Sequence, residues 1–161
     1  MRQDSSFKHS PPRYLGLHVI HSDRFGGGKL RLVRSDSLLA RLDYSFLAVL
    51  QSPQYRIIVP KEFHKGIDHV IGPIVSSDGQ QKLRYRKDII QPLTEEAEKA
   101  LAALNEIFGT LGEDEKEIGD DIMRDGTVIL LDNARWLHAR TRISDPDSWL
   151  RRARWGPEEF V

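Results

Sequence analysis

Short apolar runs separated by turn-forming residues dominate this chain. Five runs are rich in β-branched, aliphatic and aromatic residues and have the length of a strand: 14–22, 29–33, 55–59, 68–75 and 127–131. The first two are separated by segment 23–28, whose three consecutive glycines favour a tight turn. The pattern predicts a mainly β protein built from short strands.

One stretch, 95–108, has the spacing of a long amphipathic helix. Its apolar residues recur three or four positions apart, Thr94 can cap its start, and Gly109 can end it. A shorter helix is expected at 38–42. The acidic segment 112–117 is expected to be a loop that leads to the last of the five strands. The long helix is predicted to cover one face of a sheet.

Composition excludes several classes of function. Lys plus Arg and Asp plus Glu both number 24, so no net charge attracts nucleic acid or an acidic membrane surface. The absence of cysteine excludes disulfides, thiolate metal sites and cysteine nucleophiles. The apolar runs are too short to span a bilayer, and the first residues lack the apolar core of a signal peptide. Without repeats or low-complexity linkers, the chain is expected to be one cytoplasmic domain, 1–161.

The last third of the chain contains the most informative pattern. A Gly126 turn precedes an apolar strand that ends at Asp132 and Asn133, and His138 follows five positions after Asn133. Arg152 lies fourteen positions beyond His138. Imidazole is a common metal ligand, and guanidinium binds carboxylates through paired hydrogen bonds. A lone histidine at the end of a strand is nevertheless more often a surface or hydrogen-bonded residue than a metal ligand, so these residues by themselves assign no site.

This pattern resembles the closing motif of the iron(II)/2-oxoglutarate-dependent oxygenases in the taurine dioxygenase/clavaminate synthase-like superfamily. The resemblance implies that His138 is the distal iron ligand and that Arg152 binds the far carboxylate of 2-oxoglutarate. It also implies that Asn133 fixes the turn that aims His138. Arg140 and Arg142 either line the mouth of the site or solvate a loop.

The first residues resemble the proximal half of the same site. Segments 4–7 (Asp-Ser-Ser-Phe) and 11–14 (Pro-Pro-Arg-Tyr) match a region in which a His-x-Asp pair binds the metal. Asp4 then takes the carboxylate position, and Arg2 stands where the histidine is expected. Guanidinium stays protonated and offers no lone pair to a metal. A second departure is Leu30, at a position where the family often has a threonine that contacts 2-oxoglutarate.

The fold implied by the resemblance is a degenerate double-stranded β-helix, or jelly roll, with a flanking helix. Domains of the superfamily are longer than 161 residues, so the chain is expected to lack their usual N-terminal portion. An Arg-Tyr-Arg strand often precedes the long helix in the family, and this implies a further strand at 83–86. A shortened barrel is expected to form a homo-oligomer or to require a complementing N-terminal chain.

A literal His-x-Asp sequence occurs elsewhere, at His21-Ser22-Asp23. It lies one strand later than the family motif, directly before the glycine-rich turn, and a match of three residues arises easily by chance. We therefore expect surface or turn residues there. His21 and His9 nevertheless stay open as sources of the imidazole that Arg2 lacks, as does a partner chain.

The resemblance implies hydroxylation of an aliphatic C–H bond in an amino acid or another small molecule, with iron(II) and 2-oxoglutarate as cofactor and co-substrate. Retention of Asp4, His138 and Arg152 favours this function. Arg2 and Leu30 favour two alternatives, namely a degenerate homologue that binds a small molecule or a partner protein, and a truncated remnant with an exposed apolar end.

Overall fold

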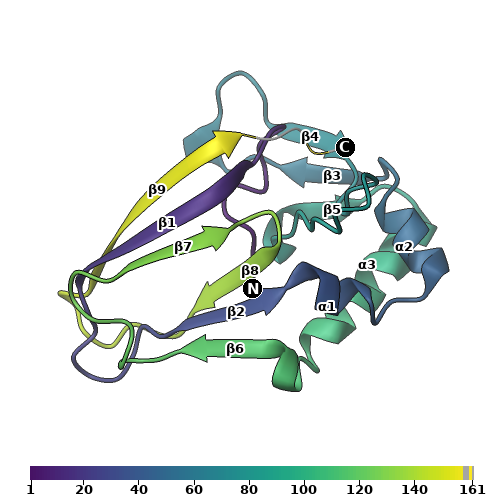
Figure 1. The fold of residues 1–161 in the computed structure, drawn as a ribbon. Helices are drawn as coiled ribbons and strands as arrows, with labels where there is room; N and C mark the ends of the chain where they lie inside the picture. Colours follow the sequence, from purple (N-terminus) through teal and green to yellow (C-terminus); the bar gives the residue numbers. More distant parts are fainter. Residues whose placement is uncertain (158–159, 161) are drawn as a thin grey trace.

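The computed structural model, which describes residues 1–157 and 160, consists mainly of antiparallel strands (Figure 1). The strands are β1 (Pro12–His21), β2 (Leu30–Arg34), β3 (Tyr55–Ile58), β4 (His69–Gly72), β5 (Ile90–Pro92), β6 (Glu115–Ile118), β7 (Val128–Asp132), β8 (Trp136–Arg140) and β9 (Trp149–Pro157). The α-helices are α1 (Ser35–Leu39), α2 (Tyr44–Leu50) and α3 (Glu95–Phe108), and the 3-10 helices are η1 (Lys61–Phe63), η2 (Lys87–Ile89) and η3 (Gly112–Asp114). The predicted mainly β class is confirmed.

The strands form three sheets of three, with the orders β7-β1-β9, β6-β2-β8 and β4-β3-β5. Each pairing within them is antiparallel. The first two sheets lie side by side in Figure 1, and the α-helices gather near β3 and β5 at the other end of the molecule. The N-terminal segment therefore reaches the space between the first two sheets, where it pairs with β8 through Arg2 and His138.

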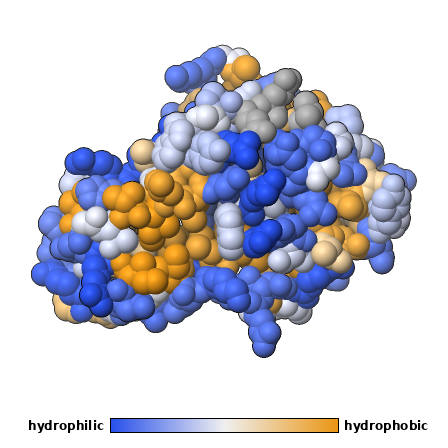
Figure 2. Space-filling view, in the orientation of Figure 1, coloured by the Kyte–Doolittle hydropathy of each residue, from blue (hydrophilic) through white to orange (hydrophobic). Residues whose placement is uncertain are grey.

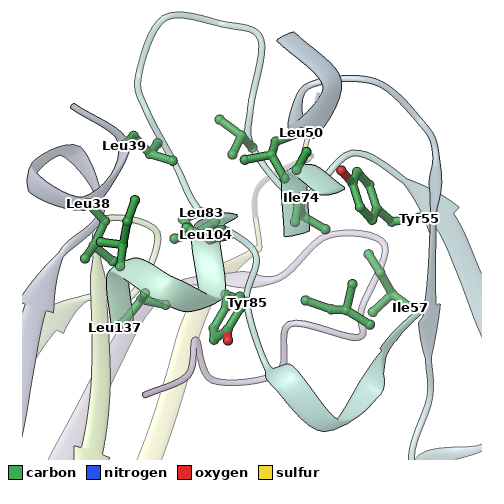
Figure 3. Packing of buried hydrophobic residues seen from close by; sticks show 14 of the residues in the cluster. Leu38, Leu39, Leu50, Tyr55, Ile57, Ile74, Leu83, Tyr85, Leu104 and Leu137 are labelled. Atoms are coloured by element: carbon green, nitrogen blue, oxygen red, sulfur yellow. The ribbon is translucent and has the colours of Figure 1, made fainter. Parts of the chain in front are cut away.

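Two hydrophobic clusters stabilise this arrangement. The larger one packs α1, α2 and α3 against the β4-β3-β5 sheet, and its central residues include Leu50, Tyr55, Ile57 and Leu104 (Figure 3). The smaller one lies between the first two sheets and contains Leu15, Leu17, Val19, Leu30, Leu32, Met123, Ile129 and Leu131. Alternate residues of β1 and β7 point into it, because successive side chains of a strand lie on opposite faces.

The opposite face of the β7-β1-β9 sheet is apolar as well, although it is open to solvent. Val128 and Leu130 on β7 expose 59% and 68% of their surface. Figure 2 shows a hydrophobic patch over the part of the molecule where β1 and β7 lie. Across the sheet, Tyr14 stacks on Trp155 with 5.8 Å between ring centroids. An apolar sheet face of this kind is typical of a surface that another element covers.

The predicted long helix is confirmed at both ends. Thr94 Oγ1 accepts a hydrogen bond of 3.1 Å from the Ala97 amide, and the helix ends before Gly109. Its buried residues are Ala97, Ala100, Leu104 and Ile107. Of the helices that the structure describes, none combines the length and the hydropathy needed to cross a bilayer.

Three expectations for secondary structure were wrong. Segment 83–86 forms only isolated bridges at Leu83 and Arg86, because Arg84 is buried and donates a hydrogen bond of 3.0 Å to the His9 carbonyl instead of aligning with a neighbouring strand. The acidic segment 112–117 is not a loop, since it begins with the 3-10 helix η3 and Glu115–Ile118 then pairs with β2 as β6. Helix α2 was not expected, because its sequence is apolar on most positions and lacks a clear helical period.

Candidate functional site

Asn133 fixes the N-terminal segment to the end of β7. Its side-chain oxygen accepts a hydrogen bond of 2.8 Å from the Asp4 amide, and its side-chain nitrogen donates to the carbonyls of Asp4 and Pro12 at 3.1 and 2.7 Å. The residue is 1% exposed. The buried amide thus satisfies three backbone groups of the N-terminal segment, which is how a residue near the chain end comes to be buried.

The Asp4 carboxylate lies between two arginines of β9. Arg152 Nη1 donates to Asp4 Oδ1 at 2.9 Å, and Arg154 Nε donates to Asp4 Oδ2. Both arginines point to the same side of β9, as the alternation of a strand requires. Burial raises the pKa of the Asp4 carboxyl, but the hydrogen bond from Arg154 and the charges of Arg152 and Arg154 outweigh it, so the net pKa lies below the ordinary value. Asp4 is therefore ionised at neutral pH.

His138 lies in the middle of β8, next to this carboxylate. Its side chain is buried, and burial lowers the pKa of the imidazole to about 4, although the Asp4 charge opposes the effect. The ring is neutral at neutral pH, so one ring nitrogen carries a free lone pair. Its Nδ1 atom is buried and has no hydrogen-bond partner within the described residues. A buried ring nitrogen of this kind is available to a ligand or a metal ion.

Arg2 occupies the third corner of the arrangement. Its backbone amide and carbonyl exchange hydrogen bonds of 2.9 Å each with the carbonyl and amide of His138. The position two before Asp4 is thus held directly against His138, where a second imidazole would complete a facial triad. Within residues 1–157 and 160, the structure brings no three His, Cys, Asp or Glu side chains together as a metal site. This chain's own donors therefore do not fit a three-residue iron site.

A cavity of about 210 Å³ opens beside these residues. Its lining includes Asp4 and the four arginines Arg2, Arg86, Arg152 and Arg154, together with Glu62 and Phe63. Four guanidinium groups against two carboxylates make the wall of the cavity positive. Such a wall attracts carboxylates and other anions.

Sequence reasoning missed the contributions of Arg86 and Glu62, because only a strand was expected from the Arg-Tyr-Arg segment that contains Arg86 and because Glu62 lies in a segment without a motif. Arg86 is brought to the cavity by its bridge to Arg2, and Glu62 by the 3-10 helix η1. Strand alternation had already indicated that Arg154 shares a face with Arg152 and competes with it for the carboxylate role. Its hydrogen bond to Asp4 had no signal in the sequence.

The other residues proposed from sequence lie outside this cavity. Arg140 donates to the Gly28 carbonyl at 2.9 Å and to Ser148 Oγ at 2.8 Å, so it fixes the glycine-rich turn. The Arg142 carbonyl accepts a hydrogen bond of 3.0 Å from the Gly28 amide at the same turn. Leu30 is buried in the smaller hydrophobic cluster. It offers no hydroxyl to a bound anion.

His21 lines a different pocket, and Asp23 holds the turn next to it. His21 lies 3.9 Å from Asp125, with 60% of its side chain exposed, and it lines a cavity with Arg24, Asp125 and Asp145. Asp23 accepts hydrogen bonds from the backbone amides of Phe25, Ser144 and Asp145. His9 is exposed and lines neither cavity. Neither histidine stands beside Asp4 as a third ligand.

Comparisons with known proteins identify the family and the fold of this chain. Residues 1–154 match the profile described as "Taurine catabolism dioxygenase TauD, TfdA family". A comparison with curated protein sequences finds no significant match.

Solved structures of two oxygenases superpose on the chain. One is asparagine oxygenase in complex with Fe(II), 2S,3S-3-hydroxyasparagine and succinate, with a TM-score of 0.79 and 23% identity over 96% of this chain and 48% of that chain. The non-heme iron oxygenase OrfP, in complex with Fe, succinate and (3S)-hydroxy-L-Arg, gives a TM-score of 0.73 and 21% identity over 96% and 48%. OrfP with Fe and alpha-ketoglutaric acid gives 0.70 and 22% over the same shares.

Likeness at these identities establishes the shared fold. It confirms the double-stranded β-helix, or jelly roll, that the sequence predicted. The chain spans about half the length of the solved structures that it matches.

Proposed function

This chain belongs to the TauD, TfdA family of taurine catabolism dioxygenases, and from that premise we propose that it is an oxygenase-type protein that acts on an amino acid or another small molecule. The reaction would be hydroxylation of an aliphatic C–H bond with iron(II) and 2-oxoglutarate. Asp4 and His138 supply two metal ligands, and Arg152 supplies the carboxylate contact. We further propose that the third ligand comes from a complementing chain, in a cytoplasmic setting.

The observation that carries this proposal is the pairing of Arg2 with His138. It places the neutral imidazole of His138 and the missing third position next to the ionised Asp4 carboxylate, which lines one cavity together with Arg2. A buried His138 Nδ1 without a partner supports a role in binding for this ring. Fold stability alone gives no reason to keep such a nitrogen unpaired.

The solved relatives support the choice of cofactor and substrate class. Asparagine oxygenase was crystallised with Fe(II), hydroxyasparagine and succinate, and OrfP with Fe and alpha-ketoglutaric acid or a hydroxylated arginine. These ligands combine a metal, a dicarboxylate and an amino acid. The positive cavity of this chain suits the dicarboxylate, because Arg152 is placed for paired hydrogen bonds to a carboxylate.

His138, Asp4 and Arg152 each have a separate role in binding. Neutral His138 keeps a lone pair available at working pH, and ionised Asp4 provides negative charge beside it. Arg152 would exchange its contact with Asp4 for one with the incoming carboxylate. Leu30 belongs to the smaller hydrophobic cluster between the first two sheets, inside the barrel.

The test is an anaerobic titration of iron(II) and 2-oxoglutarate, followed by the visible charge-transfer band of a chelated complex. We expect no band from the isolated wild-type chain and a band from Arg2→His, with iron(II) affinity raised by about 100-fold or more because a direct ligand exceeds the effect of an outer contact. Arg2→Gly with free imidazole should recover part of the band. The double variant Arg2→His/His138→Gln is the matched control and should lose it.

Each result has a definite meaning. A band from the isolated wild-type chain would contradict the proposal that this chain lacks a third ligand. No band from Arg2→His or from the imidazole-rescued Arg2→Gly would contradict the proposed metal site.

A second candidate function is favoured by the contacts of Asp4. Its carboxylate is already held by Arg152 and Arg154, so a metal is not needed to neutralise it. A degenerate homologue that binds a small molecule without iron fits this arrangement. Calorimetry of 2-oxoglutarate with wild type and Arg152→Gln in the presence of a chelator would detect such binding.

A further inference from the structure

We propose that the apolar cavity next to the arginine pair binds an amphipathic carboxylate, meaning an apolar chain or ring that ends in a negatively charged group. The bound molecule would be the substrate of the proposed function, and only this assignment as a substrate rests on that function. Binding itself requires neither iron nor 2-oxoglutarate.

The cavity has a volume of about 540 Å³ and is formed by two segments that are distant in sequence. The N-terminal segment contributes Phe7 to one wall; the region that follows β3 contributes Val59, Phe63 and Ile67, and β4 contributes Val70 and Ile71. A cavity of this size is within the range of small-molecule sites. Its width is set partly by the stack of Phe7 on Phe63, whose ring centroids are 4.8 Å apart.

Several apolar side chains of this lining are open to solvent. Phe63, Ile67 and Ile71 expose 45%, 60% and 53% of their surface. A ligand that covered them would gain hydrophobic free energy in proportion to the apolar area that leaves water. The polar amino acids of the solved relatives would gain little from such a wall.

The charged residues of the lining all have the same sign. Lys8, Lys65 and Arg154 are cations, and the remaining titratable residues are His9 and His69. The lining contains no acidic side chain among the described residues, and the nearby Asp68 is paired with His69 at 2.7 Å. An apolar wall with a basic rim is complementary to an apolar molecule that carries a negative charge.

The cavity joins the site at Arg154. Ser5, Phe7, Phe63 and Arg154 line both this cavity and the arginine-rich one that contains Asp4. Arg154 donates to Asp4 and therefore stands at the boundary of the two. A carboxylate bound at this boundary would direct its apolar part between Phe63 and Ile71.

The experiment is calorimetric titration of the metal-free chain with octanoate, octan-1-ol and octylammonium. We expect octanoate to bind about tenfold more tightly than octan-1-ol, as one charge-assisted contact implies, and octylammonium to bind most weakly. L-asparagine and L-arginine are expected not to compete. The variants are Phe63→Ser and Lys65→Glu, expected to weaken octanoate binding about tenfold and about threefold, respectively.

Matched controls are Phe25→Ser and Lys99→Glu, which change an exposed phenylalanine and an exposed lysine away from the cavity and should leave the affinity unchanged. Equal affinities for octanoate and octylammonium would overturn the proposal, as would an absence of octanoate binding or equal effects of Phe63→Ser and Phe25→Ser. The iron titration above is independent. Octanoate binding without a charge-transfer band in Arg2→His would remove the oxygenase function and keep this site.

Discussion

Two short segments resemble a His-x-Asp ligand pair in opposite ways. Segment 21–23 has the right residues, yet His21 is mostly exposed and Asp23 binds backbone amides of the neighbouring turn. Segment 2–4 has an arginine in place of the histidine, yet Asp4 is buried and Arg2 is paired with His138. Position in the fold therefore says more about the site than residue identity does.

The two segments also differ in what surrounds their carboxylates. Asp23 receives amide hydrogen bonds that hold a loop in shape, and its pKa is lowered by these amides although desolvation opposes them. Asp4 faces two arginines, a neutral histidine with an unpaired nitrogen, and a cavity. The first set of contacts is complete by itself, whereas the second leaves a binding group unused.

The largest effect should come from releasing segment 2–4. Asn133→Ala removes three hydrogen bonds to buried backbone groups, and we expect a loss of about 4 kcal/mol in the free energy of unfolding, since each unpaired group costs about 1–3 kcal/mol. Urea denaturation measures it. Asn105→Ala, which loses one contact with Tyr85, is the control and should cost much less. Equal losses would mean that Asn133 does not hold the segment.

The next effect is a pH dependence of stability that comes from His138, the residue paired with segment 2–4, and not from His21. His138 has a pKa of about 4 in the folded state, below the value of about 6.5 for a free histidine, so the unfolded chain binds more protons between these pH values. Stability is fully present above pH 6.5 and falls by about 3 kcal/mol as the pH approaches 4. Urea denaturation at pH 7 and 4.5 should show this loss in wild type and in His21→Gln. His138→Gln should abolish most of this loss. If the variant lost as much stability between pH 7 and 4.5 as wild type does, the buried neutral ring would be contradicted.

A smaller effect is expected from the turn at segment 21–23. Asp23→Ala removes the acceptor of the Phe25, Ser144 and Asp145 amides, so the thermal midpoint should fall, but by less than in Asn133→Ala. When Asp23→Ala is added to Arg2→His, the affinity for iron(II) should stay unchanged. Asp120→Ala is the control for loss of an exposed carboxylate. A loss of iron binding in Asp23→Ala would place this residue in the metal site.

The smallest effect should come from His21→Ala. The side chain is exposed and lies 3.9 Å from Asp125, so stability should change by no more than about 0.5 kcal/mol. The charge-transfer band of Arg2→His should be the same with and without this substitution. A weaker band would identify His21 as the source of a ligand.

Much of the fold could be predicted because local rules decided it. Strands β1, β2, β3, β4 and β7 followed from short β-branched runs, and α3 followed from its period, its Thr94 cap and Gly109. Segment 83–86 and helix α2 were mispredicted or missed because tertiary contacts overrode local pattern. The buried side chain of Arg84 is the clearest case, since its environment combines the His9 carbonyl with the face of the Phe160 ring.

The candidate site was predictable in its residues but not in its contacts. The resemblance to the oxygenase motif pointed to Asp4, His138 and Arg152, and the structure brings these three to one place. The motif could not reveal that Asn133 binds the N-terminal segment, because that contact joins residues 129 positions apart. It also could not reveal that Arg140 supports the glycine-rich turn.

Strand β9 gives the chain an optical reporter of its own site. Arg152 and Arg154 point from one face toward Asp4, while Trp149 and Trp155 lie half-exposed on the other face of the same strand. Indole fluorescence is sensitive to contact with water and with stacked rings, and Trp155 is stacked on Tyr14. Binding that draws the arginines away from Asp4 would therefore be transmitted through the strand as a change in emission, without any added label.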